Sequence, residues 1–133
     1  MRVFLDTNVL VSAFTTRGIC ADVVTVVVAE HQLVWGETVL AELTRVLSQK
    51  MRMPPATIAE AESFLRQEAA VVSQQSKPNV DLRDPDDIPV LAEALEGSVE
   101  VLVTGDRDFL ELTHDLPIEI LSPRGFWERL QEG

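Results

Sequence analysis

Acidic residues stand at the ends of the apolar runs of this chain, where secondary-structure elements are expected to begin or end. Asp6 closes an apolar run at residues 3–5, and Asp106 and Asp108 follow a second run at residues 101–104. If both runs are parallel strands, these acids gather at the carboxyl edge of the sheet, where open α/β sheets place their sites. Carboxylates with no Lys or His near them in sequence are costly to bring together unless a cation binds between them. The pattern therefore predicts a site for Mg²⁺ or Mn²⁺.

A third group of acids, Asp84, Asp86 and Asp87, opens a helical stretch. Asp84 can cap this helix, Pro85 suits its first position, and Asp87 falls where a capping box has its acid. Three acids nevertheless exceed what one cap needs. Asp87 shares a helix face with Leu91, which directs it toward the core, whereas Asp86 points elsewhere. Both a capping role and a site role are compatible with this pattern.

Helix capping is also the alternative explanation for Asp6 and for Asp106. For Asp6 the site interpretation is favoured, because a charge directly after a buried strand is expensive to bury without a role. Glu42 lies in a helical stretch on the ridge of Val39 and Val46, at the border of an apolar stripe. Taken alone, Glu42 is better explained as a surface residue whose stem covers apolar neighbours.

The composition indicates one folded domain over residues 1–133. Hydrophobic residues make up 46% of the chain, too many for a disordered segment. The net charge of -11 argues against broad binding to phosphate backbones. It does not argue against a nucleic-acid enzyme whose metal ions supply local positive charge. It also favours a basic protein partner.

The start of the chain does not predict a signal peptide, because Asp6 interrupts its short apolar run, and no segment is long enough to span a membrane. We therefore expect a soluble cytoplasmic protein with no membrane contact. The single cysteine, Cys20, excludes an internal disulfide and is expected to be a small core residue.

Other arrangements of reactive side chains are missing from the sequence. There is no Gly-rich phosphate loop, and His31 and His114 are isolated in polar surroundings, which argues against a zinc site or a catalytic triad. Lys50 and Arg52 form a minor basic spot that is explained as the solvated end of a helix. The cations as a whole are scattered, so the sequence predicts no substrate groove.

Strands and helices alternate along the chain, which predicts a three-layer α/β/α sandwich around a central parallel sheet. Thr7 or Asn8 can cap the first helix. Thr57 and Ser122 are the expected caps of two later helices, and Gly97 is expected to follow a helix as its C′ residue. The expected strands are residues 2–5, 32–35, 71–72, 99–103 and 118–121, and the expected helices are residues 7–13, 20–30, 37–50, 57–69, 84–96, 107–112 and 122 onward.

Four segments, taken in order, carry a resemblance to a known family. They are Val-Phe-Leu-Asp6-Thr-Asn8, Leu-Ala-Glu42-Leu, Asp84-Pro-Asp-Asp87 and Val-Thr104-Gly-Asp106-Arg-Asp108-Phe. Spread over nearly the whole chain, they resemble the PIN-domain family. The likeness is strongest to the toxins of bacterial and archaeal toxin–antitoxin pairs, the VapC-type toxins. Each segment alone is a weak signal, and the combination is what makes the resemblance specific.

The resemblance implies a sheet of about five parallel strands and a ribonuclease that hydrolyses RNA phosphodiester bonds with Mg²⁺ or Mn²⁺. It also implies an RNA substrate, a cognate antitoxin as protein partner, and a homodimer. Four acids would form the catalytic and metal-binding quartet, a fifth would assist in binding metal, and three residues would support them. The quartet is Asp6, Glu42, Asp87 and Asp106, the assisting ligand is Asp108, and the supporting residues are Asn8, Thr104 and Asp84.

Two alternative functions belong to other classes. A non-catalytic PIN-like module would bind RNA or protein, but such a module is expected to have lost acids that this chain keeps. A phosphatase of the haloacid dehalogenase type uses a strand-end Asp as nucleophile. Its motif requires a second Asp where this chain has Asn8, and a Lys opposite, and no Lys follows a strand here.

Overall fold

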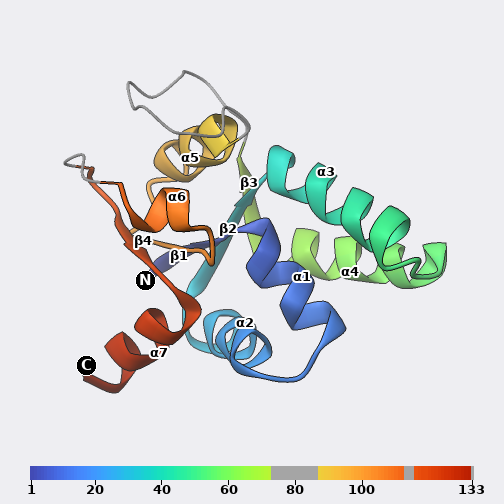
Figure 1. The fold of residues 1–133 in the computed structure, drawn as a ribbon, viewed down its shortest axis with the longest axis horizontal. Helices are drawn as coiled ribbons and strands as arrows, with labels where there is room; N and C mark the ends of the chain where they lie inside the picture. Colours follow the sequence, from blue (N-terminus) through green and yellow to red (C-terminus); the bar gives the residue numbers. More distant parts are fainter. Residues whose placement is uncertain (73–86, 113–115, 133) are drawn as a thin grey trace.

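The computed structural model describes residues 1–72, 87–112 and 116–132, and in these residues five strands form one parallel sheet (Figure 1). The strand order is β3-β2-β1-β4-β5. The strands are β1 Arg2–Leu5, β2 Gln32–Gly36, β3 Ala69–Val72, β4 Val101–Val103 and β5 Glu119–Leu121. The helices are α1 Thr7–Thr15, α2 Ile19–Glu30, α3 Glu37–Arg45, α4 Pro55–Glu68, α5 Asp87–Glu96, α6 Arg107–Leu110 and α7 Pro123–Glu132, and a π-helical turn, η1 Val46–Lys50, continues α3.

The middle of the sheet is formed by β1, which pairs with β2 on one side and with β4 on the other. Residues 3–5 and all of β4 are fully buried, as their unbroken apolar character requires. The register sets Leu5 opposite Val103, and the N–H of Asp6 donates to the Val103 carbonyl at 3.0 Å. The residues that follow the two strands, Asp6 and Thr104, therefore lie side by side at the carboxyl edge.

Helices cover both faces of the sheet, as right-handed crossovers between parallel strands require. The helices α1 and α2 lie on one face, with α7 packed against α2, and α5 and α6 lie on the other face (Figure 1). The helix α3 contacts both α1 and α5. It therefore stands where the two helical layers meet, and it closes one side of the space beyond the carboxyl edge.

The predicted sandwich and its sheet of about five parallel strands are confirmed, and each expected strand and helix is present. Cys20 is half-buried against the core, as expected for a small core residue. The cap at Ser122 is confirmed, since its Oγ accepts from the N–H of Gly125 at 2.9 Å.

Three local expectations are wrong. The helix predicted from Thr57 begins at Pro55, because proline suits the first helical position, so Thr57 lies inside it. The N–H of Gly97 still donates to the Glu93 carbonyl at 2.9 Å, so the left-handed conformation falls one residue later, on Ser98 with φ 53°. The helix expected over 37–50 is α-helical only to Arg45, and η1 completes it with π-type hydrogen bonding.

Among the described residues, no single helix combines the length and apolar character needed to cross a membrane. The helices α1 and α2 reach that length and composition only as a pair, which is bent by 104°.

Candidate metal centre

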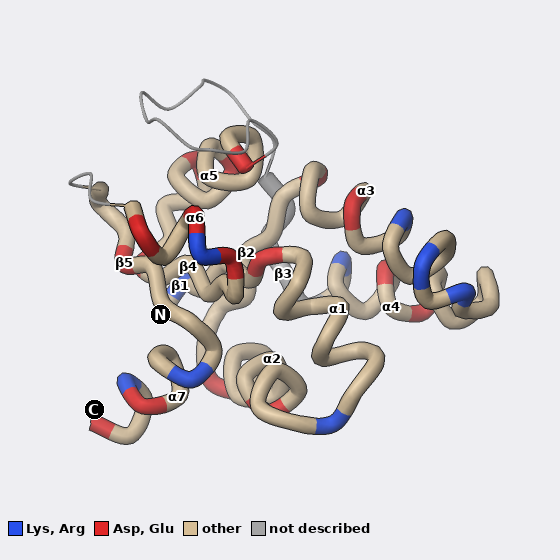
Figure 2. The backbone as a smooth tube through the Cα atoms, in the orientation of Figure 1, with Lys and Arg blue, Asp and Glu red and all other residues tan. Residues whose placement is uncertain are grey.

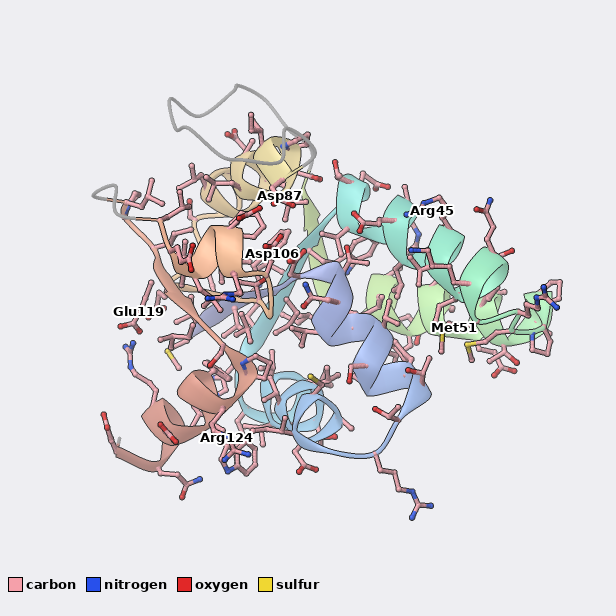
Figure 3. The ribbon with its side chains drawn as sticks, viewed as in Figure 1. Arg45, Met51, Asp87, Asp106, Glu119 and Arg124 are labelled. Atoms are coloured by element: carbon pink, nitrogen blue, oxygen red, sulfur yellow. The ribbon has the colours of Figure 1, made fainter. Side chains whose placement is uncertain are left out.

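A cavity of about 410 Å³ opens next to the ends of β1 and β4. Four acids from four parts of the fold line it, namely Asp6 after β1, Glu42 on α3, Asp87 at the start of α5 and Asp106 after β4. Figure 3 shows Asp87 and Asp106 at neighbouring ends of α5 and α6. The other lining residues are Thr7, Asn8, Val11, Ser12, Thr15 and Val46.

Three neutral donors hold the carboxylate of Asp6. Its Oδ1 accepts from the N–H of Thr7 at 2.8 Å and so caps α1. Its Oδ2 accepts from the hydroxyl of Thr104 at 2.7 Å and from the side-chain amide of Asn8 at 3.3 Å. The cap expected at Thr7 or Asn8 is therefore wrong, because α1 begins directly after the strand and Asp6 is the residue in the capping position.

The turn after β4 is fixed by the same network. The Thr104 hydroxyl oxygen accepts from the N–H of Asp106 at 3.0 Å, and the N–H of Gly105 donates to Asn8 Oδ1 at 3.0 Å. Asp106 Oδ1 accepts from the N–H of Asp108 at 2.9 Å and so caps α6. Asp6 and Asp106 each use only one carboxylate oxygen to cap a helix. Both residues can therefore cap a helix and line the cavity at the same time.

Three acids offer a donor set that fits a divalent cation. Asp87, Asp106 and Asp108 each place one carboxylate oxygen within 4.8 Å of the others. Mg²⁺ binds oxygen at about 2.1 Å, so ligands on opposite sides of its octahedron are about 4.2 Å apart, and small side-chain rotations close the difference. Carboxylate oxygens are also the hard donors that Mg²⁺ and Mn²⁺ prefer.

The electrostatics of Asp6 favour a positive charge in the cavity. Burial raises the pKa of the Asp6 carboxyl, and the nearby charge of Asp106 raises it further, while hydrogen bonds from Thr104, Thr7 and Asn8 lower it only in part. Asp6 is 6% exposed. No Lys or Arg in the described part of the chain forms an ion pair with Asp6 or Asp106. A bound cation would offset both the loss of solvation and the repulsion.

The structure brings the predicted site residues that it describes to this one edge of the sheet. The four quartet acids and Asn8 line the cavity, Asp108 joins the carboxylate triad, and Thr104 lies fully buried beneath Asp6. Asp84 and Asp86 lie outside the described residues. The choice of Asp87 as the third acid therefore rests on its own position in the cavity wall.

Sequence reasoning missed Glu93, a carboxylate that is only 1% exposed on α5. Its Oε1 and Oε2 accept from the N–H of Thr38 at 3.1 and 3.2 Å, in the first turn of α3. The capping position of α3 is Gly36, which has no side chain to cap with, and a Cβ there would lie 2.0 Å from Glu93 Oε2. Glu93 thus caps α3 from another helix and fixes α3, which carries Glu42, against α5, which carries Asp87.

A second missed group is the hydroxyl of Thr7. Thr7 lines the cavity and is 4% exposed, and its Oγ1 has no hydrogen-bond partner within the described part of the chain. From the sequence, Thr7 was expected only as a possible helix cap. Its position directly after Asp6 in the Asp-Thr-Asn segment is the signal that could have identified it.

A family model described as PIN domain matches residues 2–108 of the chain. This protein therefore belongs to the PIN-domain family. The matched region contains every residue that was predicted to form the site, from Asp6 to Asp108.

The fold agrees with a solved structure. A chain in the crystal structure of VapBC2 from Rickettsia felis, bound to a DNA fragment from their promoter, superposes with a TM-score of 0.66. The two sequences are 14% identical, and the match covers 92% of this chain and 98% of the other. A comparison with curated proteins found no match.

The raised pKa of Asp6 predicts how stability depends on pH. The folded protein binds a proton at Asp6 more tightly than the unfolded chain does. This contribution to stability is complete below the unfolded pKa of about 3.9 and is lost as the pH rises through the folded pKa. We therefore expect Asp6→Asn to flatten the decline in melting temperature of the metal-free protein between about pH 4 and pH 7.

The quantity to compare is the change of melting temperature with pH, not the melting temperature at one pH. The side-chain NH₂ of Asn would face the groups that donate to Asp6, so Asp6→Asn also changes the stability at every pH. Asp22→Asn is the control, since it makes the same chemical change at an exposed position on α2. Calorimetric melts in EDTA measure all three proteins. Parallel curves for the wild type and Asp6→Asn would contradict the assignment.

Because Glu93 lies so close to Gly36, the effects of substitutions at these two positions on the free energy of unfolding should depend strongly on each other. Gly36→Ala should destabilise the fold by about 2 kcal/mol, because the new methyl group overlaps the Glu93 carboxylate. The backbone at Gly36 has φ -111°, which alanine adopts freely, so the cost is steric. In a Glu93→Gly background, which removes the carboxylate and also the Cβ that would lie 2.8 Å from the new methyl group, the same substitution should cost less than about 1 kcal/mol, as measured by urea unfolding in a double-mutant cycle. If Gly36→Ala lowered the free energy of unfolding by the same amount in the wild type and in the Glu93 variant, the close contact between the two residues would be refuted.

Proposed function

We propose that this protein is a divalent-metal-dependent endoribonuclease and the toxin of a toxin–antitoxin pair. One observation carries the proposal, which is that four acids from four parts of a PIN-family fold line a single cavity at the carboxyl edge of the sheet. The carboxylate triad of Asp87, Asp106 and Asp108 supports the metal requirement. Magnesium or manganese is the expected ion, since both prefer oxygen donors.

When bound by these carboxylates, a divalent cation supplies a Lewis acid that lowers the pKa of water and neutralises the phosphate. The chain's own residues would orient the reactants. Asp6 is held in one orientation by Thr104 and Asn8, and its carboxylate faces the cavity without a cationic neighbour among the described residues. The buried Thr7 hydroxyl can donate to a water molecule or to a phosphate oxygen there. Hydrolysis by water then requires no covalent protein intermediate.

The partners follow from charge and from the fold comparison. A chain with a net charge of -11 and an acidic cavity favours an antitoxin segment that bears Arg or Lys, whose cation can take the place of the metal charge. The similar structure is that of a VapBC2 complex, which supports an antitoxin partner. We further propose one domain over residues 1–133, a homodimer and a cytoplasmic location.

Cleavage of RNA tests the catalytic proposal. Purified protein should cut single-stranded RNA with Mg²⁺ or Mn²⁺ and lose this activity in EDTA. Asp106→Asn should reduce the rate on the order of 100-fold or more, because substitutions even outside the ligands of metal sites cost 10–100-fold. Asn is a good N-cap, so the variant keeps the cap of α6 and should fold. A gel assay with labelled RNA measures the rates.

Asp22→Asn is the matched control and should cut RNA at the wild-type rate. RNA binding without metal-dependent cleavage would favour the non-catalytic module. Hydrolysis of a small phosphate monoester in place of RNA would favour the phosphatase alternative. Activity that survives in EDTA would exclude the metal mechanism.

Co-expression tests the partner. The product of an adjacent gene should form a complex that has no ribonuclease activity and binds less Mn²⁺ than the free protein, because its cation occupies the cavity. In the absence of that product, light scattering should give twice the chain mass of 14.8 kDa. A monomer that does not bind the neighbouring gene product would contradict both parts.

A further inference from the structure

One segment of this acidic protein carries only positive charge. Residues 43–59 contain Arg45, Lys50 and Arg52 and no Asp or Glu, in a chain of net charge -11. We call these three residues the basic edge. In Figure 2 the backbone positions of Lys and Arg (blue) follow one another along α3 and the segment after it, whereas positions of Asp and Glu (red) gather around α6 and the start of α1. The sequence alone suggested only the solvated end of a helix, because Arg45 was not grouped with the other two.

The cations of the basic edge are available to a ligand. Arg45, Lys50 and Arg52 are exposed, and none of them forms an ion pair within the described residues. Arg66 and Arg129, by contrast, are bound to Glu62 and Glu119. Three exposed cations without an ion pair among the described residues therefore lie along one segment, α3–η1 and the residues that follow it.

The backbone of Arg52 has an unusual conformation. Arg52 has φ 52°, in the left-handed region that Gly and Asn adopt most easily. Such a conformation costs on the order of 1 kcal/mol for other residues. Here it ends the helical segment, since the N–H of Met53, beyond Arg52, donates to the Leu47 carbonyl at 3.0 Å and satisfies a carbonyl of the last turn. The helix end therefore explains the backbone of Arg52, and the place of this residue in the basic edge rests on its exposed guanidinium.

The basic edge begins at the wall of the acidic cavity. Glu42 and Val46 line the cavity, and Arg45 follows Glu42 by three residues, which places it one turn further along α3 on the exposed side. From Glu42 to Lys50, where the helical segment ends, the rise is roughly 12 Å. Figure 3 labels Arg45 and Met51, which mark the course of this segment away from Asp87.

A groove of about 520 Å³ runs beside the basic edge, between α3–η1 and α4. Its α4 side is lined by Pro55, Ile58, Ala59 and Glu62, whose carboxylate is paired with Arg66. Arg45 lines the other side, together with the polar side chains of Thr44, Ser48 and Gln49. Hydroxyl and amide groups of this kind can hydrogen-bond to ribose or to base edges. Cations for phosphates and polar groups for nucleosides therefore lie on one surface that leads from the cavity.

We propose that Arg45, Lys50 and Arg52 bind the phosphate backbone of single-stranded RNA and guide it into the acidic cavity. The inference rests on the proposed ribonuclease function and assigns positioning residues to its substrate. A nucleic acid fits this surface better than the expected antitoxin does. A basic antitoxin segment would be repelled by three cations, whereas phosphates are attracted to them.

Salt-dependent binding tests this assignment without using catalysis. A labelled single-stranded RNA of about ten nucleotides is titrated with the full-length protein in EDTA at several salt concentrations, and fluorescence anisotropy gives the affinity. Each phosphate contact contributes about -0.7 to the slope of log K against log salt for single strands. The triple variant Arg45→Gln/Lys50→Gln/Arg52→Gln should therefore reduce the steepness of this slope by about 2. With Mn²⁺ present, it should raise KM for this RNA and leave kcat unchanged.

The matched comparison pairs Arg45→Gln/Lys50→Gln with Arg17→Gln/Arg124→Gln, which removes two exposed, unpaired cations elsewhere on the described surface. Only the first pair should weaken binding. Equal losses in both pairs would show a general charge effect and overturn the proposal. Unchanged RNA binding with loss of antitoxin binding would assign the surface to a protein and overturn it as well. RNA binding that depends on the basic edge, in a protein that never cuts RNA, would refute the ribonuclease function and keep the RNA surface.

Discussion

The hydrogen bond between the Thr104 hydroxyl and the Asp6 carboxylate, 2.7 Å from Oγ1 to Oδ2, is the contact on which the rest of the site depends. It joins the ends of β1 and β4, whose register already brings the two residues together. The same Thr104 oxygen accepts from the N–H of Asp106. One fully buried side chain therefore fixes the positions of two acids that repel each other, and neither acid can move away without losing a buried hydrogen bond.

The protein deals with its buried and crowded carboxylates in two ways. Burial raises the pKa of the Glu93 carboxyl, and the backbone N–H groups at the first turn of α3 lower it only in part. Asp87, Asp106 and Asp108 instead converge within 4.8 Å, and at an effective dielectric near 20 each pair repels by roughly 3 kcal/mol before solvent screening. Hydrogen bonds alone do not remove such repulsion, whereas a divalent cation does. The first arrangement connects two helices, and the second is the candidate cation site.

Much of this architecture could be predicted from the sequence, because it depends on local patterns. Unbroken apolar runs identify central parallel strands, and Asp6 and Asp106 come directly after them, so the carboxyl edge and its acids follow. Glu93 could not be predicted, since its partners near Gly36 are remote in sequence and its own helix gives no sign of them. The π-helical turn after Arg45 was missed for a different reason, because one extra residue per turn leaves no mark in the composition. The basic edge could be noticed in the sequence as a segment without acids, but the exposure of its three cations and their lack of ion pairs among the described residues are visible only in the folded structure.

If the acidic cavity is a metal centre, a crystal of the protein soaked with Mn²⁺ will hold manganese there. Anomalous scattering locates manganese independently of any assay of activity. The account predicts a peak in the cavity at about 2 Å from one oxygen each of Asp87, Asp106 and Asp108. A saturated crystal in which these carboxylates keep their positions and the cavity holds no anomalous peak would contradict it.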